Sequence, residues 1–304
     1  MNASQELSQK QINKIGKKFR DSIYDEEDFS FLEEYKKEYD EILINKTSKL
    51  SELIRKKINN FILVGRLKRT NSIIRKLQRK KNYGMDLTRM SDIAGLRIIV
   101  NDIKDQNIII ETIKSNLQID KIYDYRETEQ NYRSIHLVLR ENNKYLEIQI
   151  RTVAQQTWAD ESEGFGEHAK QGFYSEQVGL YLKILSDVVY KIDNIKDYKI
   201  ENIYNHLFEI KSPIKGKYSL IKKTFNNYKL ITLEPPKYFL IVYDSLDSTL
   251  ISEDDFDLDE KNEVFELYKY KSKLLDNDRY EIIFFISNLG NQVLRVSHPR
   301  FFMR

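Results

Sequence analysis

Hydrophobic residues recur at steps of three and four over residues 29–60, and this spacing predicts one long amphipathic helix. The apolar run at 61–69 is too short for a helix of this kind and predicts a strand. Asn71 is a residue type that caps helices, so the pattern after it predicts a helix over 72–80 that ends near Gly84.

Strand and helix patterns alternate in the next part of the chain. The patterns predict strands at 93–100, 132–140 and 145–152, and helices at 105–117 and from Val153 onward. The polar turn at 141–144 should join the last two strands into an antiparallel hairpin. We therefore expect an α/β domain with a sheet of about five strands and helices packed on it.

The sequence pattern in the C-terminal third of the chain predicts a second structural unit. The pattern is helical from about 175 to 230, and Pro235-Pro236 marks a domain boundary. A strand at 238–244, an acidic loop, a helix near 258–273 and a strand at 281–287 then predict a small α/β module. The expected organisation is a helical segment at 1–60, an α/β core at 61–175, a helical extension at 176–236 and the C-terminal module at 237–304.

Composition excludes several classes of protein. The chain has 304 residues and no cysteine, which excludes disulfide scaffolds, thiolate zinc sites, iron–sulfur clusters and cysteine nucleophiles. The first residues lack the apolar stretch of a secretory signal, and no apolar run is long enough to cross a bilayer. We expect a cytoplasmic protein without a membrane partner.

Charge is unevenly distributed along the chain. Residues 46–89 contain 14 Lys and Arg against two acids, whereas residues 244–281 contain 13 acids against five bases. A basic segment followed by an acidic one fits a polyanion-binding first part and a second part able to bind or screen it. Two solvated faces without a binding role are the alternative.

Common catalytic motifs are missing. The sequence has no phosphate-binding GxxxxGK[ST] loop, no GxGxxG that opens a helix after a strand, and no GxSxG elbow. The four histidines stand far apart, and none is followed by Asp. Serine hydrolases, Rossmann dehydrogenases and histidine–aspartate metallohydrolases are therefore excluded.

Two predicted strands carry polar residues at strand spacing. Tyr132 and His136 share one face of the first strand, and Glu147, Gln149 and Arg151 share one face of the second. The hairpin makes these strands neighbours, so one sheet face could gather all five side chains. A solvent-facing sheet surface is the alternative interpretation.

Basic residues and one carboxylate precede these strands. Ser72 and Lys76 are four residues apart on one helix face near its N-terminus, a favourable place for phosphate oxygens, and Arg66 and Lys68 stand just before. Asp92 directly precedes a hydrophobic strand, a position expected of a Mg²⁺ ligand shared with substrate phosphates. An ordinary turn residue is the alternative interpretation.

Taken together, four segments resemble the synthetase domain of RelA/SpoT-type alarmone enzymes. They are GRLKRTNSIIRK (65–76), SDIAGLRIIV (91–100), NYRSIHLVL (131–139) and EIQIRTVAQQTWADESE (147–163). The resemblance covers about residues 29–175 and implies a mixed, nucleotidyltransferase-like α/β sheet. It also implies transfer of the β,γ-pyrophosphate of ATP to the 3′-hydroxyl of GDP or GTP, with Mg²⁺ as cofactor, in a synthetase-only protein that has no hydrolase domain.

The resemblance also implies a role for each motif residue. Arg66, Lys68, Ser72 and Lys76 would hold the ATP phosphates, assisted by Arg97. Asp92 would bind Mg²⁺, and Glu147 would orient and deprotonate the attacking hydroxyl and share the metal. On the acceptor side, Tyr132 would stack on the base, His136 would contact its phosphate or ribose, and Gln149 and Arg151 would support Glu147.

Two departures from the family pattern concern the acceptor. Asn131 replaces the usual Gly before Tyr132, and the loop at 125–130 is short and lacks the Lys- and Pro-rich sequence of many guanosine-specific members. A second hypothesis is therefore a toxic relative that pyrophosphorylates the 3′-terminal adenosine of tRNA in a toxin–antitoxin or phage-defence system. Its activity would be restrained by residues 237–304, or by a protein trigger or antitoxin that acts through them. A third is a non-catalytic nucleotide- or RNA-binding regulator, and the resemblance further implies a homo-oligomer.

Overall fold

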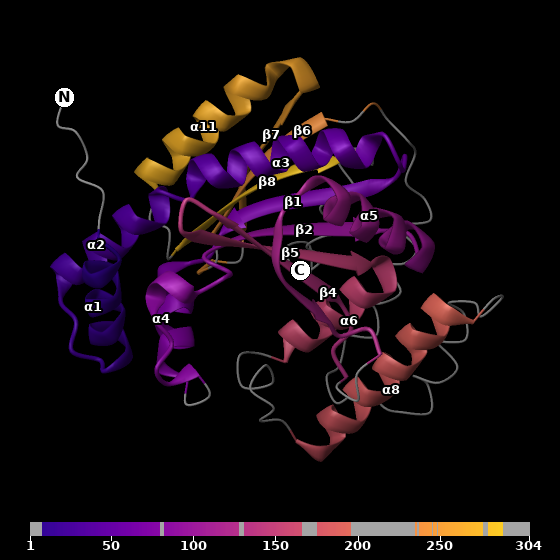
Figure 1. Ribbon diagram of the computed structural model, residues 1–304, viewed down its shortest axis with the longest axis horizontal. Coiled ribbons are helices and arrows are strands. Elements are labelled where there is room, and N and C mark those ends of the chain that lie inside the picture. Colours follow the sequence, from indigo (N-terminus) through magenta and orange to yellow (C-terminus); the bar gives the residue numbers. More distant parts are fainter. Residues whose placement is uncertain are drawn as a thin grey trace.

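The computed structural model describes residues 8–79, 82–127, 131–165, 175–195, 235, 237–244, 246–247, 249–275 and 279–287. Its centre is a single eight-stranded sheet with the strand order β3-β4-β5-β2-β1-β8-β6-β7 (Figure 1). The strands are β1 (Phe61–Leu67), β2 (Ala94–Val100), β3 (Ile119–Asp124), β4 (Ile135–Glu141), β5 (Lys144–Thr152), β6 (Lys237–Asp244), β7 (Thr249–Phe256) and β8 (Tyr280–Ser287). Strands β2 and β5 run parallel and the other neighbouring pairs run antiparallel, so the predicted mixed α/β sheet is confirmed. It has eight strands instead of the expected five or so, because the C-terminal strands join it.

Helices cover both faces of this sheet. They are α1 (Gln9–Arg20), α2 (Glu26–Lys37), α3 (Asp40–Arg55), α4 (Thr70–Gln78), α5 (Ile103–Asn116), α6 (Val153–Gly164), α8 (Glu176–Asn194) and α11 (Lys261–Leu274), with short 3₁₀ turns at Leu87–Arg89 and Leu258–Glu260. Helices α3, α5 and α11 pack on one face, and α6 and α8 pack on the other (Figure 1). Among the described helices, none combines the length and hydropathy needed to cross a bilayer.

The predicted long helix over 29–60 is wrong, because the chain breaks between α2 and α3. The amide of Tyr39 donates to the carbonyl of Lys36 at 2.9 Å, a tight turn that ends α2. Tyr35 and Tyr39 are both buried, their rings lie edge to face, and their hydroxyl oxygens are 3.0 Å apart. The buried Tyr35 precedes the break and the buried Tyr39 follows it, and no Gly or Pro marks this position in the sequence.

The predicted N-cap at Asn71 is also wrong, since α4 already begins at Thr70 and no side chain caps it. The hydroxyl of Thr70 is fully buried and accepts from Nζ of Lys36 at 2.6 Å, while it donates to Glu33. A tertiary contact with α2 thus replaces the local cap that the sequence pattern indicated.

The hairpin between β4 and β5 is confirmed. Asn142 and Asn143 adopt φ angles of 49° and 60°, which suits a two-residue turn and residue types that tolerate the left-handed region. However, β4 begins at Ile135 rather than at residue 132, so Tyr132 lies in the loop before the strand. Two strands were not predicted: β3 lies in the segment before this loop, and β7 occupies part of the expected acidic loop.

The strands of the predicted C-terminal module extend the central sheet. Strand β8 pairs with β1 from Ile62 to Gly65, and the ring of Phe284 packs against Gly65 so closely that a Cβ there would lie 2.5 Å from Cζ of Phe284. Side chains of β6, β8 and α11 share one buried cluster with α3 and β1. Of the helical extension, α8 is described, and residues 196–234 and the tail from 288 lie outside the described residues.

We predict that Gly65→Ala destabilises the fold by about 1–3 kcal/mol, because the added methyl group must displace the ring of Phe284. Phe284→Leu in the same chain should recover part of that loss, since the smaller side chain vacates the space. Urea unfolding of the wild type, both single variants and the double variant tests this coupling. Strictly additive losses would contradict the packing of β8 on β1.

A second prediction concerns Asp40, the first residue of α3. Burial raises its pKa to about 6, although Tyr268 of α11 donates a hydrogen bond to it. Because the folded-state pKa lies above the ordinary value of 3.8, the ionised carboxylate destabilises the fold increasingly as pH rises from about 4 to 6. Asp40→Asn should therefore stabilise the protein by about 1–3 kcal/mol at pH 7.5 and by less at pH 4.5.

The measurement is urea unfolding of Asp40→Asn and wild type at both pH values. Glu41→Gln is the matched control, because the neighbouring side chain is exposed on the same helix turn. An equal effect of Asp40→Asn at both pH values would contradict the raised pKa.

Candidate functional site

Polar side chains form a row across the sheet face that carries α6 and α8. The register places Arg66 of β1 opposite Gly95 of β2, and Gly95 in turn opposite Glu147 of β5. Arg97 and Gln149 pair in the same way two positions further along β2 and β5. A pocket opens on this row and is lined by Val64, Arg66, Lys68, Asp92, Gly95, Leu96, Arg97, Glu147 and Gln149.

Asp92 is held by two lysines at one edge of the pocket. It directly precedes β2, and its two carboxylate oxygens accept from Nζ of Lys68 at 2.8 Å and from Nζ of Lys76 at 2.7 Å. Burial by itself would raise the pKa of Asp92, but the two ammonium groups outweigh burial and hold that pKa well below its usual range. Asp92 is therefore ionised, and both lysines are kept beside the pocket.

Glu147 is fixed from both sides on β5. Its Oε1 lies 3.0 Å from Nδ1 of His136, and its Oε2 accepts from Nε2 of Gln149 at 2.8 Å. Burial would raise the pKa of Glu147, yet the contact with His136 lowers it below its ordinary value. Burial by itself would lower the pKa of His136, but the same contact raises it. The carboxylate of Glu147 is thus ionised and oriented.

The polar chain continues from His136 to Tyr132 and Arg151. The hydroxyl of Tyr132 lies 2.7 Å from Nε2 of His136 and accepts from Nη2 of Arg151 at 2.7 Å. The ring of Tyr132 lies edge-on to Tyr125 and to Trp158, with centroids 5.6 and 5.8 Å apart. Burial would raise the pKa of Tyr132, but Arg151 and His136 lower it.

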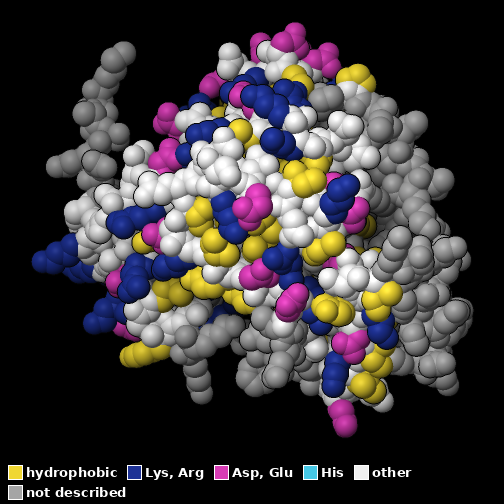
Figure 2. Space-filling view, turned by 45° about the vertical axis from the view of Figure 1, so that its right-hand side comes forward, with side chains coloured by type: hydrophobic (Ala, Val, Ile, Leu, Met, Phe, Trp, Pro, Cys, Tyr) yellow, Lys and Arg dark blue, Asp and Glu magenta, His cyan; other side chains and the backbone are white. Residues whose placement is uncertain are grey.

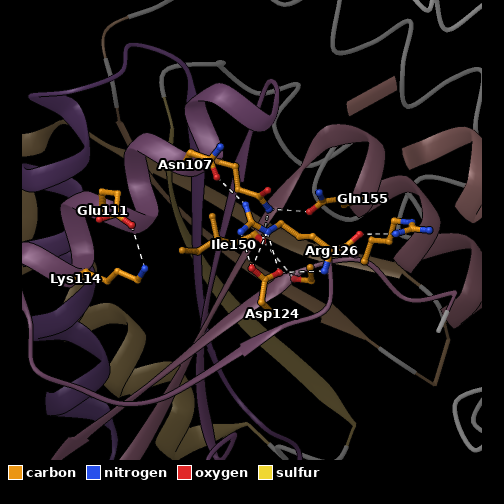
Figure 3. A network of polar contacts seen from close by, with 10 residues as sticks. Asn107, Glu111, Lys114, Asp124, Arg126, Ile150 and Gln155 are labelled. Carbon is orange, nitrogen blue, oxygen red and sulfur yellow. Dashed lines mark hydrogen bonds and ion pairs between the residues drawn. The ribbon is translucent and has the colours of Figure 1, made fainter. Parts of the chain in front are cut away.

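The loop that holds Tyr132 is anchored where it leaves β3. Arg126 donates from Nη2 to Asp124 at 2.6 Å and from Nη1 to Asn107 of α5 at 2.7 Å (Figure 3). Arg133 donates to the carbonyl of Arg126 and from Nε to Oγ of Ser186 on α8 at 3.0 Å. These contacts fix both ends of the segment around residues 128–130, which lie outside the described residues.

Most of the predicted residues meet on this face, with one difference. Ser72 stands in the first turn of α4 and does not line the pocket, whereas Lys76 on the next turn of the same helix reaches Asp92. Arg66, Lys68, Arg97, Glu147 and Gln149 line the pocket directly.

Sequence reasoning missed three carboxylates near the arginines of this site. Burial and the charge of Arg151 lower the pKa of Arg97 to about 10, and Glu163 and Asp160 of α6 partly offset this. Burial and Glu163 raise the pKa of Asp160 to about 7. Their three-residue spacing on the predicted helix was a signal for this pair. The third, Glu281 of β8, forms an ion pair with Arg66 and had no local signal.

Asp92 and Glu147 are the residues of this pocket that could hold a divalent cation together with a substrate. Both line the pocket, and the charge of Asp92 tends to raise the pKa of Glu147, as expected of two carboxylates on one small volume. Within the described residues, no group of three or more His, Asp or Glu could hold a metal by itself. Mg²⁺ commonly binds through one or two carboxylates plus substrate phosphates, and this donor set suits it.

Comparisons with known proteins point to one family. A family model described as "Region found in RelA / SpoT proteins" matches residues 65–171. GTP pyrophosphokinase YjbM of Bacillus subtilis is 32% identical over 145 residues, which cover 43% of this chain and 67% of that protein. GTP pyrophosphokinase of Haemophilus influenzae is 27% identical over 168 residues, covering 51% of this chain and 22% of that enzyme.

Among solved structures, the small alarmone synthetase 1 from Bacillus subtilis is similar to this chain. The two are 26% identical, and the match covers 59% of this chain and 99% of that one with a TM-score of 0.47.

We predict that Asp92→Asn strengthens the binding of inorganic triphosphate in the absence of divalent cations by about tenfold, or about 1.4 kcal/mol. The wild-type carboxylate competes with the anion for Lys68 and Lys76, and the amide competes far less. Isothermal titration in EDTA measures the change. Glu111→Gln, which removes a carboxylate paired with one lysine on the exposed side of α5, should leave binding unchanged. Weaker binding by Asp92→Asn would contradict this account of the lysines.

Proposed function

The chain belongs to the RelA/SpoT family, and from this premise we propose that it is a Mg²⁺-dependent pyrophosphokinase. The reaction transfers the β,γ-pyrophosphate of ATP to the 3′-hydroxyl of a guanosine nucleotide, GDP or GTP. The name of the Bacillus subtilis relative, a GTP pyrophosphokinase, supports the class of reaction. The observation that carries the proposal is the pocket in which Lys68, Asp92 and Glu147 meet.

The donor side of this pocket is suited to a triphosphate. Lys68 directly follows β1 and Lys76 lies on α4, and Asp92 holds both in place before any substrate binds. Phosphate oxygens can replace the carboxylate as partner of the two ammonium groups, which leaves Asp92 available as a metal ligand. Pyrophosphoryl transfer depends chiefly on positioning and charge neutralisation, and fixed cations supply both.

The acceptor side is suited to a hydroxyl nucleophile. Glu147 is ionised and held by His136 and Gln149, so it can accept a hydrogen bond from the 3′-hydroxyl and then take its proton. The hydroxyl oxygen forms a bond to the β-phosphorus, the bond between that phosphorus and the α,β-bridging oxygen breaks, and AMP leaves. Mg²⁺ held by Asp92 and Glu147 would neutralise part of the phosphate charge.

A second candidate keeps this chemistry and uses the 3′-terminal adenosine of tRNA as acceptor. A second hollow beside Val138, the register partner of Glu147, is lined by the cations Lys76, Arg89 and Lys121 together with Tyr83, Tyr123 and Tyr145. Lys and Arg side chains also crowd the left side of the molecule in Figure 2, the side on which Figure 1 places α1 and α4. Cations and exposed aromatic rings are what RNA binding uses, and this observation favours the second candidate.

The test is a transfer assay with γ-³²P-ATP and Mg²⁺ in which GDP, GTP and total tRNA are offered separately. We expect label on GDP or GTP. Label on tRNA alone would replace the guanosine acceptor with the second candidate, and label on none of them would favour a non-catalytic regulator.

In the same assay, Asp92→Ala and Glu147→Gln should each lower the rate by about 100-fold or more, because each removes a carboxylate from the reacting centre. Glu111→Gln is the control, since its carboxylate lies on the opposite sheet face and contacts only Lys114 among the described residues. A near-normal rate for either site variant would contradict the assigned roles.

A further inference from the structure

The pocket residue Arg66 has its ion-pair partner in the C-terminal part of the chain. Arg66 lies near the end of β1, and its Nη1 contacts Oε1 of Glu281 in β8. The side chain of Glu281 is only 5% exposed, whereas that of Arg66 is 35% exposed. The buried carboxylate of Glu281 lies outside the lining of the pocket and contacts the guanidinium of Arg66, which does line it.

Electrostatics explains why Arg66 needs such a partner. Arg97 lines the same pocket, and its pKa is lowered by burial first and then by the like charges of Arg151 and Arg66. Two guanidinium groups close together repel each other, and nearby carboxylates offset that repulsion. The carboxylates of Asp160 and Glu163 compensate the charge of Arg97, and the carboxylate of Glu281 compensates the charge of Arg66.

Backbone pairing fixes Glu281 relative to Arg66. Strand β8 is hydrogen-bonded to β1 at Ile62–Gly65 and to β6 along its whole length, from Tyr280 to Ser287. The contact of Phe284 with Gly65 lies one residue before Arg66. A carboxylate mounted on a central strand holds its partner more precisely than one on a loop.

From these contacts we infer that Glu281 is a positioning residue for the donor nucleotide: it holds the guanidinium of Arg66 at the pocket, so the C-terminal strand completes the ATP site. The inference rests on the proposed function in that the bound nucleotide is taken to be ATP. Glu281 engages Nη1 of Arg66, so the other N–H groups of the guanidinium can donate to phosphate oxygens.

The test compares Glu281→Gln with wild type for binding of an ATP analogue whose α,β-bridging oxygen is a methylene group. Titration calorimetry should show about tenfold weaker binding by Glu281→Gln. In the transfer assay, KM for ATP should rise by a similar factor, while kcat and KM for the acceptor change less than about twofold. Glu266→Gln is the matched control, because that exposed carboxylate of α11 pairs only with Lys269 among the described residues. It should leave all of these values unchanged.

A double-mutant cycle with Arg66→Gln separates positioning from general stability. In the Arg66→Gln background, Glu281→Gln should weaken analogue binding no further. Glu281→Asp, which keeps the charge with a shorter reach, should recover part of the affinity.

Each other outcome overturns the inference in a distinguishable way. If the wild type binds the analogue and Glu281→Gln binds it equally well, with only a lower melting temperature, the role of Glu281 is structural. Tighter binding by Glu281→Gln would make Glu281 a competitor of ATP for Arg66. If the wild type itself does not bind the analogue, the proposed function fails together with the inference.

Discussion

Strand β1 is hydrogen-bonded along both edges, and this double pairing is the constraint on which the rest of the structure depends. On one edge it pairs with β2 from Phe61 to Leu67, which aligns Arg66 with Gly95 and so with Glu147 beyond it. On the other edge it pairs with β8, which brings in Glu281. A strand fixed on both sides cannot shift its register without moving all of its side chains to the wrong face.

Most charges on the site face have an opposite charge beside them before any ligand binds. Asp92 contacts both Lys68 and Lys76, His136 contacts Glu147, and Glu281 contacts Arg66. Such pairing allows many charges to lie on one partly buried surface, since an unpaired buried charge would cost several kcal/mol. A bound polyanion can take Lys68 and Lys76 from Asp92, whereas Arg66 can keep Glu281 and bind phosphate through its remaining N–H groups. Affinity then depends in part on how easily Asp92 gives up its two lysines.

Local patterns predicted the elements that local forces determine. The strands around 93–100 and 145–152 and the hairpin with Asn142 and Asn143 follow from spacing, which also placed His136, Glu147 and Gln149 on one sheet face. Only the family resemblance assigned Asp92 and Lys68 to the same site. The family resemblance added the roles of these residues.

Where tertiary contacts decide, the local pattern failed. Buried Tyr35 and Tyr39 break a helix that periodicity extends through them, and buried Thr70 starts α4 without a cap. The exposed strand β3 lacks a hydrophobic face, so it gave no strand signal. Nothing local links Arg66 to Glu281, because the two residues are 215 positions apart in the sequence and come together where β8 pairs with β1.

The place of β8 also constrains how the C-terminal segment could regulate the site. Ile283, Phe284 and Ile286 are fully buried, and each such side chain contributes about 1.5–3 kcal/mol by its burial. Release of the whole segment would expose these side chains, the edge of β1 and the buried side of α3. A partner would have to supply all of that free energy to remove the segment as a unit. A small movement of Glu281 relative to Arg66 requires far less free energy, because the side chain of Arg66 is already about a third exposed. Control through this segment is therefore expected to act on the ion pair within an intact sheet rather than through separation of a domain.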